Sequence, residues 1–232
     1  MIQQAAQVFL LNLYDLDDTV CRQFYEAVSP ERRRKANRYR IHDDAVRCVM
    51  SEALVRYVYH HIRKKKEPPE FVYPPRGKPY LKNDPAFHFS VSHTGMFAAV
   101  GYADSEIGID IEQINRPLDR ESIAGSVFTL EEQAYVFEPL NELMCMLRFT
   151  EMWTAKESYL KYLGCGFRKS PLSFSVDMKT GTVHEKVSGI VPGITVLGKR
   201  LPEDYCLTAC GSIGDISLEW INDRSIMDVI LK

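Results

Sequence analysis

The chain lacks the features that mark exported, membrane-spanning and zinc-finger proteins. Its six cysteines form no CxxC pair and no paired zinc spacing, so we expect reduced, mostly buried thiols rather than disulfides or a zinc site. Its apolar runs fall far short of the roughly 18 residues that a membrane-spanning helix needs. Its first residues show no basic segment followed by a small-residue cleavage site. We therefore expect a cytoplasmic protein with no membrane partner.

A large excess of either charge is also missing. The 29 Lys and Arg residues nearly balance the 31 Asp and Glu residues, giving a net charge of −2. This balance argues against a globally basic nucleic-acid binder. At 232 residues, of which 45% are hydrophobic, the chain can form one large domain or two small ones. Positive charge is dense in one segment, which follows Glu31 and contains Arg32, Arg33, Arg34, Lys35, Arg38 and Arg40.

Helix and strand signals are mixed along the chain, which indicates the α+β class. Ser29 and Pro30 are typical of a helix N-cap and first turn, and Gly164 is typical of a helix stop. We predict, in chain order, a strand at 8–11, helices from 30 and from 43, a proline-rich loop at 71–82, strands at 87–91, 97–102 and 107–112, a connector at 115–126, a helix opening at 128–129, a helix at 143–163 and short strands across 172–222.

Two acids alternate with isoleucine in the segment 107–112, IGIDIE. On a strand the isoleucines share one face, and Asp110 and Glu112 share the other, about 6 to 7 Å apart. A divalent cation can bridge that gap. The alternative for such a pair, taken alone, is the solvated side of an edge strand.

A third acid lies on the predicted helix at 143–163. Glu157 is one turn before Lys161 and one turn after Trp153, so the three side chains share a helix face. An exposed Glu–Lys pair is the alternative interpretation, but the tryptophan favours partial burial, where a carboxylate requires a partner. Three acids on ordered elements suggest oxygen-ligated Mg²⁺ and phosphate chemistry.

The remaining candidate residues are two residues at the end of a predicted strand and four cationic side chains. Ser92 and His93 precede a Thr-Gly turn; adjacent strand residues point to opposite faces, so a nucleophilic triad is disfavoured and phosphate contact is more plausible. Arg32 and Lys35 lie one helical turn apart and can share a phosphate. Arg47 and Lys78 supply further positive charge. A solvated cationic face or a nucleic-acid patch is the alternative for the basic run, but neither explains the acids.

Five motifs in this order resemble those of the 4′-phosphopantetheinyl transferases of the long, surfactin-synthetase-activator type. The resemblance runs from about Ser29 to Phe174. Its motifs are GKP at 77–79, FSVSHTG at 89–95, IGIDIE at 107–112, FTLEE at 128–132 and WTAKES at 153–158, with Lys161 following.

The resemblance implies transfer of the phosphopantetheine arm of coenzyme A to a serine of an apo acyl or peptidyl carrier protein, with release of 3′,5′-ADP. It implies that Asp110, Glu112 and Glu157 hold Mg²⁺. It further implies that Glu157 is the base, directly or through water, and that Lys161 acts at the leaving phosphate. The implied coenzyme A contacts are Arg32, Lys35, Arg47, Lys78, Ser92 and His93. The alternative is a catalytically inactive coenzyme A or nucleotide-binding module.

The same resemblance implies two similar α/β halves in a pseudo-twofold arrangement, with the active site in the cleft between them. The expected halves are 1–105, which holds the nucleotide contacts, and 106–232, which holds the metal site and the carrier contacts. A monomer is expected, because one chain supplies both halves, and no nucleic-acid partner is expected. Arg32 and Cys48 depart from the family pattern, which has lysine and threonine there. Arg32 keeps the charge, and Cys48 weakens one contact.

Overall fold

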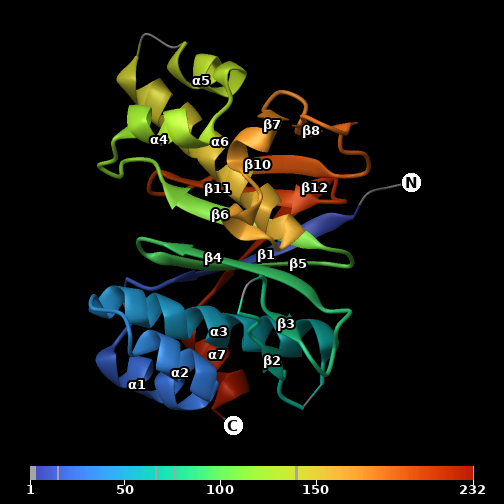
Figure 1. The fold of residues 1–232 in the computed structure, drawn as a ribbon. Coiled ribbons are helices and arrows are strands. Elements are labelled where there is room, and N and C mark those ends of the chain that lie inside the picture. The colour runs from blue at the N-terminus through green and yellow to red at the C-terminus, as the bar shows by residue number, and fades with distance from the viewer. Residues whose placement is uncertain (1–3, 15, 66, 76, 139–140, 232) are drawn as a thin grey trace.

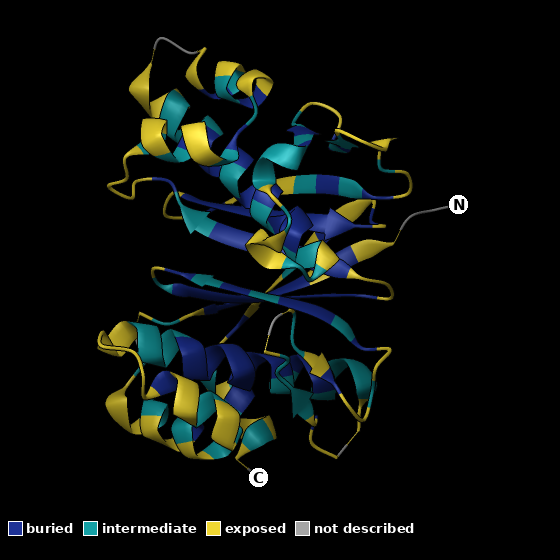
Figure 2. Ribbon diagram, viewed as in Figure 1, coloured by how far each residue is buried: buried dark blue, intermediate teal, exposed yellow. Residues whose placement is uncertain are grey.

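Two sheets lie face to face in the middle of the molecule, and helices cover their outer faces (Figure 1). The computed structural model describes residues 4–14, 16–65, 67–75, 77–138 and 141–231. Figure 2 shows buried strands at the centre and exposed residues on the outer helices. The mixed α+β class predicted from the sequence is confirmed.

The first sheet has the order β12-β1-β5-β4. Strand β1 pairs in parallel with β12 and antiparallel with β5, and β4 pairs antiparallel with β5. Its strands are β1 (Ala5–Asn12), β4 (His88–Thr94), β5 (Phe97–Ala103) and β12 (Asp215–Ile221). Its helical layer comprises α1 (Asp18–Ala27), α2 (Pro30–Ala36), α3 (His42–Arg63) and α7 (Asp223–Ile230), with the short strands β2 (Phe71–Val72) and β3 (Tyr80–Leu81) beside it.

The second sheet has the order β10-β11-β6, and its pairs are antiparallel. The long helix α6 packs on β6 and β11. Its strands are β6 (Ile107–Gln113), β10 (Thr195–Leu201) and β11 (Tyr205–Gly211). Around it lie α4 (Arg120–Val127), α5 (Leu130–Phe137), α6 (Glu142–Leu163), η1 (Gly166–Arg168), η2 (Pro171–Ser173) and a small third sheet of β7 (Phe174–Asp177), β8 (Thr182–Glu185) and β9 (Gly189–Ile190).

Strand β1 shows how the layers are built from a period-two pattern. Val8 and Leu10 point into the core between the two sheets, where they join Ile109 of β6. Phe9 and Leu11, on the other face, pack into the core under the helices. Both faces of this strand are therefore buried, so an uninterrupted apolar run is required here in place of an apolar–polar alternation.

Several sequence predictions about element ends are confirmed. The Ser29 side chain caps α2 with Pro30 in its first turn, and Gly164 ends α6 in the left-handed conformation, at φ 63°. The connector predicted at 115–126 is wrong in part, because α4 begins at Arg120. The Asp119 side chain accepts a hydrogen bond from Ser122 N and caps this helix, and the buried Ala124 anchors it in the core. Tertiary packing stabilises a helix that is too short to form alone.

No helix within the described part of the chain is long and apolar enough to cross a membrane.

The last helix belongs to the core of the first sheet, and this placement predicts a stability effect. Ile226 of α7 is fully buried in that core, whereas Val229 is exposed. We expect Ile226→Ala to lower the free energy of unfolding by roughly 2–5 kcal/mol, because it leaves a cavity. Val229→Ala, on the same helix, is the control and should change it by less than about 0.5 kcal/mol. Urea denaturation followed by circular dichroism measures both, and equal effects would contradict this placement of α7.

Candidate active site

A cavity of about 810 Å³ is lined by residues from both sheets and from the helices that cover them. From the first part of the chain, its lining includes Arg32 and Lys35 on α2, Arg38 just after α2, and Tyr73 and Gly77 in the loop between β2 and β3. It also includes Ser92 and His93 on β4, Asp110 and Glu112 on β6, and Lys161 on α6. The lining cations come from α2, the residues after it and α6, and the carboxylates Asp110 and Glu112 come from β6. A ligand with several phosphates is the class of molecule that such a lining suits.

The acids reach the cavity because α6 lies very close to β6. Gly108 faces this helix, and a Cβ atom there would lie 2.0 Å from Ser158 O and 2.3 Å from Tyr162 N. Only glycine permits such an approach of helix backbone to strand. The approach brings Lys161 of α6 over Asp110, two residues after the glycine.

Asp110 is the centre of a compact hydrogen-bonded group. Its Oδ1 accepts hydrogen bonds from Lys161 Nζ and from Ser92 Oγ, both at 2.7 Å. Ser92 Oγ in turn accepts from Lys161 Nζ at 2.9 Å and from Ile111 N at 3.3 Å. Asp110 is 4% exposed, yet its Oδ2 is a buried atom with no hydrogen-bond partner among the described residues.

Ser90 and Ser92 hydroxyls also join the two sheets. Ser90 Oγ accepts from Ile109 N at 3.0 Å, as Ser92 Oγ accepts from Ile111 N. Strands β4 and β6 are therefore joined through side-chain oxygens, which fixes the position of Asp110 relative to β4.

Glu112 has two partners of its own. Its Oε2 accepts from Thr94 Oγ1 and from Arg116 Nη1, both at 2.8 Å. Arg116 is partly exposed and lines a smaller apolar cavity with Trp153 and Phe149. Glu112 lies on the boundary of both cavities.

Glu157 lies close enough to Asp110 and Glu112 for their charges to affect its pKa. The pKa of Glu157 is raised to about 7, chiefly by burial and also by repulsion from Asp110 and Glu112, while Lys161 acts in the opposite direction. Three carboxylates therefore influence one another at this point. A carboxylate in such a setting requires a cation or a proton to compensate it.

The residues present partly fit a magnesium ion. Carboxylate oxygens are the ligands that Mg²⁺ prefers, and Asp110 Oδ2 is a buried acceptor to which none of the described residues donates a hydrogen bond. In the described part of the chain, however, no three His, Cys, Asp or Glu side chains are already arranged around a single ion position. Asp110 is the residue that fits such an ion best.

The predicted cations fall into two groups. Arg32 and Lys35 line the large cavity. Arg47 instead donates to Gly95 O at 2.7 Å and pairs with Asp44 at 2.6 Å. Lys78 donates to Glu106 at 2.9 Å and to Ile107 O at 2.6 Å. Neither Arg47 nor Lys78 is part of the cavity lining.

His93 supplies a neutral side chain. The pKa of His93 is lowered to about 4, chiefly by burial and also by the positive charges of Lys161, Lys35 and Arg47. Its imidazole is therefore uncharged near neutral pH and can contribute a hydrogen bond but no positive charge.

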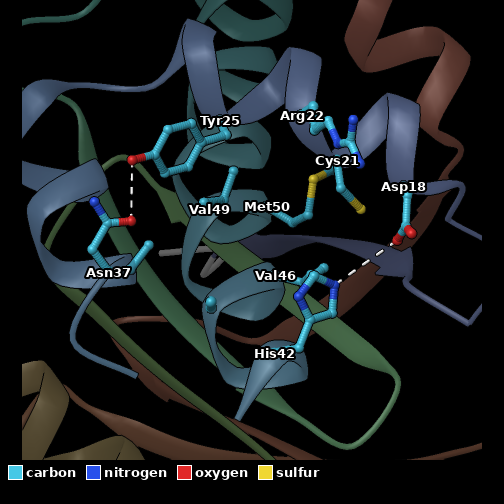
Figure 3. Close-up of a pocket in the computed structure, with 11 residues that line it drawn as sticks. Asp18, Cys21, Arg22, Tyr25, Asn37, His42, Val46, Val49 and Met50 are labelled. Atoms are coloured by element: carbon cyan, nitrogen blue, oxygen red, sulfur yellow. Dashed lines mark hydrogen bonds and ion pairs between the residues drawn. The ribbon is translucent and has the colours of Figure 1, made fainter. Parts of the chain in front are cut away.

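A second cavity, of about 270 Å³, lies within the helical layer between α1, α2 and α3 (Figure 3). Val46, Val49 and Met50 line it, with Tyr25 hydrogen-bonded to Asn37 at 3.0 Å on one side. It contains neither the acids nor the cationic residues of α2 that face the large cavity, so the large cavity is the candidate active site.

Comparison with known proteins agrees with this choice. A model of the 4′-phosphopantetheinyl transferase superfamily matches residues 106–210, and a model of the N-terminal part of 4′-phosphopantetheinyl transferases matches residues 18–105. The chain is 32% identical to the 4′-phosphopantetheinyl transferase psf-1 of Bacillus pumilus over 175 residues, which is 73% of each chain. This chain belongs to the 4′-phosphopantetheinyl transferase family.

Other relatives extend the similarity of this transferase. It is 32% identical to the 4′-phosphopantetheinyl transferase Sfp of Bacillus subtilis over 66% of its length and 67% of the relative's. It is 29% identical to the 4′-phosphopantetheinyl transferase gsp of Aneurinibacillus migulanus over 88% of its length and 86% of the relative's. The family membership and the enzyme class that the sequence motifs predicted are confirmed.

Sequence reasoning missed three residues at this site: Glu52, Tyr73 and Arg116. Glu52 is a fully buried carboxylate in α3, and its position among the apolar residues of this helix, with Arg56 one turn later, was an available signal, since a buried charge requires partners. Tyr73 lies in the proline-rich loop, where no periodic pattern indicates a direction. Arg116 follows Glu112 by four residues across a turn, a spacing that carries meaning only in a helix.

The close approach of α6 to β6 predicts that an alanine substitution has different effects at two glycines, Gly108 and Gly198. Gly108→Ala should displace α6, lower the free energy of unfolding by about 1–3 kcal/mol or more and strongly reduce transfer. Gly198→Ala on β10 is the control, because a Cβ there would meet no atom closer than 3.9 Å. Denaturant unfolding and a transfer assay measure both variants. A Gly108→Ala enzyme as stable and active as the control variant would show that the helix does not depend on this contact.

Proposed function

We propose that this transferase moves the 4′-phosphopantetheine arm of coenzyme A to a serine of an apo acyl or peptidyl carrier protein, in a Mg²⁺-dependent reaction that releases 3′,5′-ADP. The observation that carries the proposal is the group formed by Asp110, Lys161 and Ser92 in a cavity that Arg32, Arg34, Lys35 and Arg38 also line. Coenzyme A carries a pyrophosphate and a separate phosphomonoester, and two charged regions within one cavity suit such a molecule.

The reaction exchanges the phosphoanhydride bond of the coenzyme A pyrophosphate for a phosphate ester bond to serine. The serine oxygen forms a bond to the phosphorus that carries pantetheine, the bridging P–O bond of the pyrophosphate breaks, and 3′,5′-ADP departs with its 5′-phosphate as the leaving group. Such a transfer requires positioning and charge neutralisation more than covalent catalysis. The cavity supplies both through fixed side chains.

Each residue of the acid group has a role in the proposal. Asp110, Glu112 and Glu157 would hold Mg²⁺, which when bound neutralises pyrophosphate charge. Lys161 Nζ, which donates to Asp110 in this structure, would donate to the leaving phosphate. Glu157, whose pKa is raised to about 7, would accept the serine proton directly or through water. A base with a pKa near neutrality suits this role.

The other predicted contacts serve the nucleotide. Arg32 and Lys35 would bind phosphate from α2, and Ser92 and His93 from β4, all within the cavity lining. Arg47 and Lys78, which pair with Asp44 and Glu106 in this structure, keep a proposed role in phosphate binding at the edge of the site.

We further propose that the chain divides at 105 and 106 into two related halves in pseudo-twofold arrangement, with coenzyme A between them. The matched family models meet at this point, and the cavity lining draws on both halves. The last strand and helix, β12 and α7, return to the sheet and core of the first half. A single chain then supplies a complete site, which supports a monomer.

The proposal predicts that two acids are indispensable. Asp110→Asn and Glu157→Gln should each reduce transfer at least about 10²-fold, because each removes a carboxylate ligand of the Mg²⁺ that would neutralise the charge of the reacting phosphates. The assay incubates the enzyme with coenzyme A, Mg²⁺ and an apo carrier protein and weighs the carrier by mass spectrometry. Chelation of Mg²⁺ should also stop the wild-type reaction.

The control for these variants is Glu142→Gln, an exposed acid on the same helix α6. It should retain full activity. Circular dichroism should show that all three variants are folded. If no carrier protein gains the mass of the arm from wild-type enzyme, the proposed function is wrong. If the Asp110 and Glu157 variants act like the control, the site assignment is wrong.

A further inference from the structure

Glu52 is a fully buried carboxylate outside the acid group. Its Oε1 accepts from Ser29 N at 2.7 Å and from Arg56 Nη2 at 2.8 Å. Its Oε2 accepts from Ser29 Oγ at 2.7 Å and from Tyr73 OH at 2.5 Å. Burial alone would raise the pKa of Glu52, but the bonds from Tyr73, Arg56 and Ser29 lower it overall, so the group is ionised.

Arg32 is the second cation beside this carboxylate. Its Nε lies 3.4 Å from Glu52 Oε2, its Nη2 donates to Tyr73 OH at 3.1 Å, and its Nη1 lies 3.6 Å from Cys48 Sγ. The guanidinium carbon lies over the Tyr73 ring, 4.9 Å from the ring centroid. Four contacts from three residues therefore fix the plane of this guanidinium.

Two features leave Arg32 available to an anion. Arg56 Nε and Nη2 both donate to Glu52 Oε1 and balance its charge, so the group of Glu52, Arg56 and Arg32 has an excess of one positive charge. A guanidinium has five N–H donors, and three of them are committed in the contacts above. The remaining two, one on each Nη atom, match two oxygens of one phosphate.

Tyr73 links these elements. Its hydroxyl accepts from Arg32 and donates to Glu52, and its ring stacks on Phe71, at a centroid distance of 5.8 Å and an angle of 9°. Both Tyr73 and Arg32 line the large cavity. By contrast, the Lys35 side chain on the same helix is exposed and no anchoring bond of this kind holds it within the described contacts.

We propose that Glu52 and Tyr73 are positioning residues that hold the Arg32 guanidinium in a fixed plane, ready to bind a phosphate of coenzyme A with its two remaining N–H groups. Preorganisation of this kind raises affinity because the side chain loses little freedom on binding. The inference rests on the proposed function, since it assigns Arg32 to the phosphates of that substrate. It makes Tyr73, a residue of an irregular loop, a determinant of nucleotide affinity.

The test variant is Tyr73→Phe, which keeps the ring and removes the hydroxyl. We expect the KM for coenzyme A and the Kd for 3′,5′-ADP to rise together, by roughly fivefold to tenfold, while kcat stays within about twofold. Transfer kinetics and calorimetric titration with 3′,5′-ADP measure these quantities separately. Tyr25→Phe is the matched control: it removes a hydroxyl bonded to Asn37 in the same helical layer, away from the large cavity, and both constants should remain at their wild-type values.

A double-mutant cycle separates positioning from a general structural effect. In an Arg32→Lys background, which keeps the charge but not the planar fork, Tyr73→Phe should cause no further loss of 3′,5′-ADP affinity. Equal losses in the wild-type and Arg32→Lys backgrounds would overturn the inference, as would a Tyr73→Phe enzyme with unchanged affinity. Glu52→Gln provides a second route if Tyr73→Phe does not fold, with the same expected increases. Failure of the wild-type enzyme to bind 3′,5′-ADP would instead count against the proposed function.

Discussion

The site depends on a steric constraint at Gly108, where the backbone of a strand and the backbone of a helix come together. A side chain on this strand residue would overlap Ser158 and Tyr162 of α6. Without that approach, Lys161 would not lie 2.7 Å from Asp110, and Glu157 would not be close enough to share the repulsion of the other acids. The glycine of the IGIDIE segment is therefore as much a part of the site as the acids beside it.

The charges of these side chains then determine which ligands the cavity favours. Asp110 is buried, with one oxygen bonded to Lys161 and Ser92 and the other without a hydrogen-bond partner among the described residues. Glu157 has a raised pKa because it is buried and because two more carboxylates lie close to it. Such a group gains stability from a further cation, and across the cavity the excess positive charge near Arg32 gains stability from an anion. A magnesium salt of a phosphorylated ligand would satisfy both sides at once.

The sequence predicted what depends on local patterns. The isoleucines of β6 lie in the core as their alternation indicates, and Ser29 and Gly164 mark helix ends because capping requires only neighbouring residues. The parallel pairing of β1 with β12 joins residues more than 200 positions apart, and no local pattern indicates it. The same limit applies to Tyr73 and Glu52, whose contact depends on how a loop folds onto α3. The position of Asp110 relative to Ser92 was likewise beyond the sequence, since side-chain hydroxyls and not a backbone ladder join the two strands.

We propose that the transferase binds its metal at Asp110 Oδ2, the buried oxygen to which no described residue donates a hydrogen bond. The test is anomalous diffraction from crystals grown with coenzyme A and Mn²⁺, which prefers the same oxygen ligands as Mg²⁺. We expect an anomalous peak about 2.0–2.3 Å from Asp110 Oδ2, with a carboxylate oxygen of Glu112 or Glu157 and a phosphate oxygen beside it. A metal peak elsewhere in the cavity, with Asp110 Oδ2 still without a partner beside bound coenzyme A, would contradict it.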